Sequence, residues 1–132
     1  MIQISVQSRQ HAEFISVTDE IQRMVTQHGW KEGVLTVYVP HTTAGVTIQE
    51  NADPDVVRDM IYALEKAVPW KDPNYRHAEG NTAAHVKAAM LGTSAQCIVT
   101  KGHLALGTWQ GIYFCEFDGP RTRQMWLTFH PT

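Results

Sequence analysis

The chain has 132 residues, the usual size of one domain, and 43% of them are hydrophobic, which is enough for a sizeable core. We therefore expect a single domain over residues 1–132. The net charge of −2 excludes the broad basic surface typical of nucleic-acid-binding domains, and no hydrophobic run approaches the ~20 residues of a membrane-spanning helix. Neither nucleic acid nor a membrane is an expected partner.

The two cysteines, Cys97 and Cys115, lie in strand-like runs without the close spacing of a metal or redox motif. Buried free thiols are therefore favoured over a disulfide, which is typical of a cytoplasmic protein. The first six residues alternate like a strand and lack the pattern of a signal peptide.

The first half of the chain is predicted to contain four strands and one helix. Residues 2–6 and 14–17 are expected to pair as an opening hairpin, and Thr18 to cap a helix that ends at His28-Gly29. A β-branched strand over residues 33–39 breaks at 40–45 and resumes over 46–50. Glu50 falls on the apolar face of that last strand, either buried or solvated at the strand end.

The second half predicts two helices, three strands and one long loop. Asp53 is expected to cap a helix with Pro54 at its first position, and an apolar stripe continues to about residue 67. The loop over residues 68–80 is longer than most connections, and such loops often carry function. Asn81 is expected to cap a third helix that Gly92 ends, and strands over 95–100, 112–117 and 123–129 follow.

Residues 102–121 form the stretch around which the rest of the chain is expected to pack. A glycine-rich loop over 102–111 leads into a strand that is apolar on both faces. Glu116 lies within this strand and needs a partner, because an unpaired buried carboxylate costs several kcal/mol. Arg121, Arg123, a histidine or a neighbouring subunit are the expected partners. The order of the elements predicts an α+β domain built on antiparallel sheet.

Three of the seven histidines stand out by their context. His41 lies where a strand breaks, His77 lies in the long loop, and His85 lies near the start of the third helix among alanines. A metal site needs about three such ligands, so these histidines are candidates to bind a divalent ion. Hydrogen-bonded or exposed histidines are the alternative.

Several groups suit a phosphate. Thr42 and Thr43 supply hydroxyls, and the helix that begins at Asn81 supplies backbone N–H groups. Arg121 and Arg123 supply bidentate positive charge. The glycine-rich loop matches neither a P-loop nor a dinucleotide motif, so no nucleotide cofactor is predicted.

Trp109 and Gln110 are candidates to stack on and hydrogen-bond a flat heterocycle, although Trp109 is equally compatible with a place in the core. No Ser-His-Asp or Cys-His pairing is evident. The residues alone thus predict a polar pocket and leave its reaction open.

A set of motifs spread over nearly the whole chain resembles the YjbQ-like family. They are PHTTAGVTI at 40–48, ENAD at 50–53, His77, EGN at 79–81, AH at 84–85, Gly102, LGTWQG at 106–111 and EFDGPR at 116–121. The Gly-Thr-Trp-Gln run is specific to that family.

The resemblance implies a jelly-roll-like β sandwich with about three helices, assembled as a homotrimer. It also implies a secondary thiamine-phosphate synthase activity, which joins hydroxymethylpyrimidine diphosphate to thiazole phosphate and releases pyrophosphate. The positions that match the family motifs and carry polar or aromatic groups are His41, Thr42, Thr43, Glu50, His77, Asn81, His85, Trp109, Gln110, Glu116 and Arg121.

The leading hypothesis is a small soluble enzyme acting on phosphorylated heterocycles. Its expected catalytic residues are His77, His85 and Glu50. The expected substrate-binding residues are Thr42, Thr43, Asn81, Trp109, Gln110 and Arg121, and the expected ligands of a Mg²⁺ or Zn²⁺ ion are His41, His77 and His85. Two alternatives remain, a metal-dependent hydrolase in which Glu50 activates water, and a non-enzymatic trimer that binds a small ligand.

Overall fold

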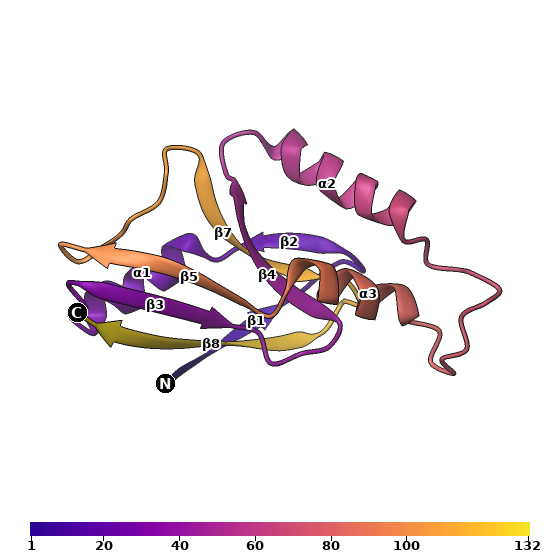
Figure 1. The fold of residues 1–132 in the computed structure, drawn as a ribbon, viewed down its shortest axis with the longest axis horizontal. Coiled ribbons are helices and arrows are strands. Elements are labelled where there is room, and N and C mark those ends of the chain that lie inside the picture. Colours follow the sequence, from indigo (N-terminus) through magenta and orange to yellow (C-terminus); the bar gives the residue numbers. More distant parts are fainter.

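The computed structural model describes residues 1–132 as eight strands and three helices (Figure 1). In chain order the elements are β1 (Ile2–Gln7), β2 (Glu13–Ser16), α1 (Thr18–Gln27), β3 (Gly33–Tyr38), β4 (Ala44–Glu50), α2 (Pro54–Ala67), α3 (Thr82–Leu91), β5 (Ser94–Thr100), β6 (His103–Leu104), β7 (Gln110–Glu116) and β8 (Thr122–Pro131). The α+β class with mostly antiparallel strands is confirmed.

Two antiparallel sheets enclose the main core. One sheet has the strand order β1-β8-β3-β5-β6 and the other the order β2-β7-β4. The inward side chains alternate along each strand, as in Leu35 and Val37 of β3 and Ile112 and Phe114 of β7, all of which are fully buried. Ile21 and other apolar residues of α1 join the same core.

A third layer, made of α2 and α3, covers the outer face of the three-stranded sheet (Figure 1). Tyr113, Cys115 and Phe117 point to that side and pack against the small side chains of α3. Gly45 of β4 lies under the end of α3, where a Cβ atom would be 2.8 Å from the carbonyl oxygen of Gly92. The alanines of α3 and this glycine let the helix lie close to the sheet.

Two local predictions are wrong. Residues 2–6 and 14–17 do not form a hairpin, because β1 pairs with β8 in one sheet and β2 pairs with β7 in the other. Thr18 does not cap α1. The cap position is Val17, and the Thr18 hydroxyl instead accepts a hydrogen bond from the backbone N–H of Ile112 at 2.8 Å. Both differences come from long-range pairing with β7 and β8, which local patterns do not encode.

The outer face of the five-stranded sheet is uncovered and carries no charged side chain. Its outward residues are Gln3, Ser5, Gln7, Val34, Thr36, Tyr38, Ser94, Gln96, Ile98, Thr100, His103, Thr122, Gln124, Trp126, Thr128 and His130. Tyr38 and Trp126 stack on one another here, and Ile98 is 62% exposed. Exposed surfaces of monomeric proteins usually carry both signs of charge.

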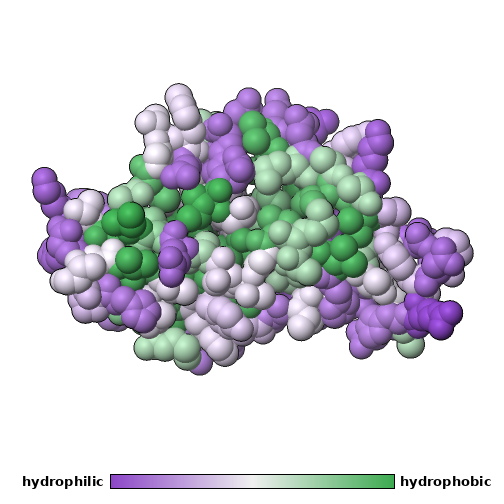
Figure 2. All heavy atoms as spheres, viewed as in Figure 1, coloured by the Kyte–Doolittle hydropathy of each residue, from purple (hydrophilic) through white to green (hydrophobic).

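Hydrophobic residues also gather over α3 and beside α2 (Figure 2). Val86 and Met90, one turn apart on α3, are 39% and 57% exposed. None of the three helices is long and apolar enough to cross a membrane.

An ion pair between Lys87 of α3 and Glu65 of α2 links the two helices. Lys87 is only 1% exposed, whereas the Glu65 side chain is 39% exposed. We expect Glu65→Ala to lower the free energy of unfolding by about 2 kcal/mol, because it leaves a buried ammonium unpaired. Urea denaturation measures this change.

Lys87→Met is the matched variant, since it keeps an unbranched side chain one atom shorter and removes the charge. It should cost less than Glu65→Ala, because burying an apolar chain leaves nothing unpaired. Equal losses for the two variants would show that the charge of Lys87 is solvated without Glu65.

Candidate functional site

The candidate site is a polar pocket of about 460 Å³ at the end of the sandwich where β3 leads into β4. None of its lining residues is hydrophobic. They are Pro40, His41, Thr42, Thr43, His77, Glu79, Asn81, His85, Asp118, Arg121 and Arg123. The connection between β3 and β4, the start of α3, the long loop before it and the turn between β7 and β8 all contribute. We refer to this set of residues as the polar pocket.

The floor of the polar pocket is a buried ion pair between Glu116 of β7 and Arg123 of β8. Arg123 donates from Nε to Oε1 of Glu116 at 2.9 Å, and its Nη2 donates to the carboxylate and to the hydroxyl of Thr43 at 2.8 Å. The Ser8 hydroxyl also donates to Glu116, at 2.6 Å. The predicted pairing of Glu116 with a nearby arginine is thereby confirmed.

The protonation of Glu116 is set by two opposing effects. Burial favours the neutral acid, but hydrogen bonds from Arg123, Ser8 and the backbone N–H of Asp118 favour the anion and hold the pKa of Glu116 below its ordinary value. The carboxylate is therefore ionised at neutral pH and compensates the charge of Arg123. No hydrogen bond uses Nη1 of Arg123, which is the donor that remains for a ligand in the polar pocket.

A second charged group lines the rim. Arg121 donates from Nε to the carbonyl oxygen of Asp118 at 2.9 Å and from Nη2 to its carboxylate at 3.1 Å. The same carboxylate oxygen accepts from Nδ2 of Asn81 at 2.8 Å. Arg121 is exposed and has further N–H donors in its planar guanidinium group, which suits it to a phosphate.

His41 is held with a fixed tautomer at the edge of β8. Its Nε2 accepts a hydrogen bond from the backbone N–H of Gln124 at 2.9 Å, so the proton of the neutral ring lies on Nδ1. Burial lowers the pKa of His41, and the positive charge of Arg123 lowers it further. His41 is therefore a neutral hydrogen-bond donor at neutral pH.

His77 and His85 lie together, with ring centroids 5.5 Å apart and planes at 81°. Two imidazoles that share a tetrahedral zinc ion, each ~2.0–2.1 Å from it, have centroids roughly 5 Å apart. The separation of the two rings is therefore compatible with a shared ion. No group of three His, Cys, Asp or Glu side chains is arranged to hold a metal, so the expected three-ligand centre with His41 is not assembled within the chain.

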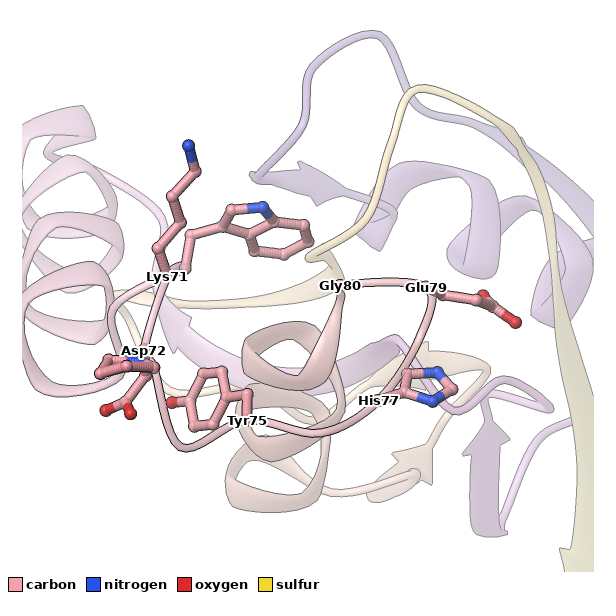
Figure 3. A pocket seen from close by; sticks show the side chains of 8 residues that line it. Lys71, Asp72, Tyr75, His77, Glu79 and Gly80 are labelled. Carbon is pink, nitrogen blue, oxygen red and sulfur yellow. The ribbon is translucent and has the colours of Figure 1, made fainter.

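A second hollow of about 540 Å³ adjoins the polar pocket and shares His77 and Glu79 with it (Figure 3). The predicted long loop builds it, and its lining includes Trp70 and Tyr75. In Figure 3 the side chains of His77 and Glu79 extend away from Tyr75, toward the far side of the loop. The two hollows together offer a polar end and a partly aromatic end.

The structure does not bring Glu50, Trp109 or Gln110 into the polar pocket. Ala44 pairs with Glu116 at the pocket end of β4 and β7, whereas Glu50 pairs with Gln110 at the opposite end. Six residues of strand separate the two ends by ~20 Å. Trp109 is 63% exposed, so it is not a core residue either.

Local contacts account for the other two side chains at that end. The Glu50 carboxylate accepts from the backbone N–H of Ala52 at 2.9 Å, and the Gln110 side-chain oxygen accepts from Gly107 at 2.8 Å. Glu50 is half-buried, so it is neither a deeply buried carboxylate nor a member of the polar pocket. Both residues shape turns at the strand ends.

Four residues that serve the site were missed or undervalued by the sequence-based prediction. Asp118 and Glu79 line the polar pocket, Arg123 forms its floor, and Ser8 supports Glu116 from the end of β1. The Asp118-Gly119-Pro120-Arg121 turn was a usable signal for Asp118, since it follows directly on the anomalous Glu116. Nothing in the polar surroundings of Ser8 predicts its contact with Glu116 of the other sheet.

The fold and the pocket define a class, namely an α+β sandwich with a polar, histidine- and arginine-lined pocket at one end. The sequence matches the model of the family described as UPF0047 protein YjbQ-like over residues 2–132. The chain belongs to this family.

Relatives and solved structures agree with this assignment. The UPF0047 protein YugU of Bacillus subtilis is 48% identical over 124 residues, which cover 94% of each chain. A UPF0047 protein of Methanocaldococcus jannaschii is 42% identical and covers 96% of this chain and 91% of its own. A crystal structure of an uncharacterized YjbQ/UPF0047 protein from Clostridium acetobutylicum superposes with a TM-score of 0.95 at 46% identity, covering 98% of this chain and all of the other.

Proposed function

We propose that the chain is an enzyme acting on small phosphorylated heterocycles, with thiamine-phosphate synthase activity as its reaction or a side reaction. The observation that carries the proposal is the polar pocket, where Arg121, Nη1 of Arg123 and the two threonines surround a space without a single hydrophobic residue. Such a pocket suits a diphosphate and suits an apolar ligand poorly.

The synthase reaction needs mainly a site for its leaving group. The bond between the pyrimidine methylene carbon and the diphosphate oxygen breaks, the diphosphate leaves with the electron pair, and the thiazole nitrogen forms the new C–N bond. Donors fixed around the diphosphate stabilise the charge that develops on it. Arg121, Arg123 and Thr42 would supply these donors, and His77 or His85 a proton.

The heterocycle belongs in the adjoining hollow rather than near Trp109. Trp70 and Tyr75 line that hollow, which meets the polar pocket at His77 and Glu79. Aromatic side chains are suited to stack on a pyrimidine ring. The proposal therefore assigns the stacking role expected for Trp109 to Trp70 and Tyr75 of the long loop.

A divalent ion is part of the proposal. The spacing of His77 and His85 suits a Zn²⁺ ion between the two imidazoles. A Mg²⁺ ion would instead be held by the oxygens of the diphosphate and by water. The alternative hydrolase, in which Glu50 activates water beside the histidines, is disfavoured because Glu50 lies at the far end of β4.

The direct test is an assay for thiamine phosphate formed from hydroxymethylpyrimidine diphosphate and thiazole phosphate. The purified protein should form the product with Mg²⁺ and lose the activity with a chelator. His85→Ala should lower kcat by at least about 100-fold if His85 transfers a proton. His28→Ala, on an exposed residue at the end of α1, is the control and should leave the rate unchanged. A rate equal to the uncatalysed reaction would rule out the synthase activity.

We also propose that the chain assembles as a homotrimer in the cytoplasm. The charge-free outer face of the five-stranded sheet supports an interface, since the centres of interfaces are depleted of charged residues. This face reaches the polar pocket, because Gln124 lies on it and its backbone binds His41. The two buried free thiols suit a reducing compartment.

Sedimentation equilibrium at micromolar concentration should give three times the 14.9 kDa chain mass. Ile98→Lys places a charge at an exposed apolar position of this sheet face. It should shift the population toward monomer, because burying the lysine in the interface costs free energy. Gln27→Lys, at an exposed position of α1 away from that face, is the matched control. A wild-type monomer would contradict the trimer.

A further inference from the structure

Asn81 presents an unsatisfied acceptor at the polar pocket. The residue is 7% exposed and lines the pocket, and its Oδ1 is the one buried side-chain oxygen or nitrogen in the chain without a hydrogen-bond partner. The orientation of the amide is fixed, because Nδ2 donates to the carboxylate of Asp118 at 2.8 Å. Rotating the amide would set two acceptor oxygens against one another.

The helix that follows does not use this oxygen. Asn81 occupies the cap position of α3, but its side chain makes no capping hydrogen bond. The backbone N–H groups of Ala84 and His85 donate instead to the main-chain oxygen of Asn81, at 3.0 and 3.4 Å. A buried acceptor left without a donor costs about 1–3 kcal/mol, so a donor from a bound ligand would relieve it.

The same pocket contains donors that need an acceptor. Arg121 and Nη1 of Arg123 have N–H groups available to a bound molecule. These positively charged donors favour an oxoanion. The carboxylates of Asp118 and Glu79 stand beside Asn81 and add to the acceptor side. A ligand that satisfies both sides is an oxoanion that carries its own O–H group.

Resting on the proposed function, we infer that the polar pocket selects protonated phosphate over sulfate, with Asn81 Oδ1 accepting the phosphate O–H. Inorganic phosphate keeps at least one proton throughout the neutral range, whereas sulfate is fully deprotonated. Against sulfate, Asn81 Oδ1 would face a second acceptor and remain unpaired. The specificity-determining residue is therefore Asn81, and the arginines provide the affinity common to both anions.

The test is isothermal titration of the full chain with inorganic phosphate and with sulfate, at pH 7 and constant ionic strength. Wild type should bind phosphate at least about tenfold more tightly than sulfate, which corresponds to 1.4 kcal/mol. Asn81→Ala should reduce this ratio to below about threefold. Asn81→Gly, which also removes the acceptor and is tolerated at a helix cap position, should reduce the ratio in the same way, and it substitutes for Asn81→Ala if that variant fails to fold.

Arg121→Ala is the matched control and should weaken both anions while leaving their ratio unchanged. Equal binding of phosphate and sulfate to wild type would overturn the role of Asn81 and leave the anion site standing. An unchanged ratio of phosphate to sulfate affinity in Asn81→Ala would also overturn the role of Asn81 and leave the anion site standing. If neither phosphate nor sulfate bound to wild type, the proposed function itself would be overturned.

Discussion

Glu116→Ala is expected to lower the free energy of unfolding by at least ~3 kcal/mol. The variant leaves the charge of Arg123 unpaired. Arg123 is 3% exposed, and its Nε has no hydrogen-bond partner except Glu116. Removing one partner of a buried ion pair typically costs ~3–5 kcal/mol, because the remaining charge is left without compensation. Urea denaturation followed by circular dichroism measures the loss.

Two variants separate the charge effect from ordinary truncation. Asp59→Ala removes an exposed carboxylate of α2 and should change stability by less than ~0.5 kcal/mol. Glu116→Leu combined with Arg123→Met removes both charges and should recover much of the stability lost by Glu116→Ala. A loss of under ~0.5 kcal/mol for Glu116→Ala would show that the pair is effectively solvated.

The Glu116–Arg123 ion pair makes the free energy of unfolding depend on pH. Because the folded-state pKa of Glu116 is lowered, its contribution is fully present above the unfolded value of ~4.3 and is lost as the pH falls through the folded pKa. Wild type should therefore lose stability relative to the Glu116→Leu, Arg123→Met variant only below about pH 4.3.

Arg121→Ala is expected to weaken the binding of inorganic pyrophosphate by about 10- to 100-fold. A hydrogen bond between charged groups contributes about 1.5–3 kcal/mol, and Arg121 has N–H donors beyond the two that bind Asp118. Its exposed position at the rim means that the fold should tolerate the change. Isothermal titration with pyrophosphate measures the dissociation constant.

The control for this prediction is Arg23→Ala, which removes the same charge from an exposed position on α1. It should change the pyrophosphate affinity by less than twofold. Arg121→Lys should fall between the two, because lysine keeps the charge but lacks the planar pair of donors. Identical affinities for Arg121→Ala and Arg23→Ala would remove Arg121 from the site.

Much of the fold was predictable because the local signals were strong. The Asp53-Pro54 start of α2, the alternation of β3 and the loop before α3 all appear where the sequence places them. The hairpin and the Thr18 cap were wrong because β1 and β2 find partners more than ninety residues away, and no local pattern specifies a distant partner.

The residues of the candidate site also differ in how well the sequence predicted their positions. His41, His77 and His85 were found because each has an unusual context, and the structure brings all three to one pocket. Glu50 and Trp109 carried equally unusual contexts but lie at the other end of the same strands. Sequence position along a strand gives the face of a residue, whereas the end of the sheet at which a site forms depends on which loops meet there.

The most direct test of the polar pocket as the ligand site is an NMR titration of the ¹⁵N-labelled protein with pyrophosphate and Mg²⁺. The backbone amide signals of residues 41–43, 81–85, 118–119 and 121–123 should shift with one common affinity, while those of residues 107–111 stay in place. Shifts confined to residues 107–111, around the exposed Trp109, would contradict the assignment of the site. The absence of any shift at millimolar pyrophosphate would contradict it as well.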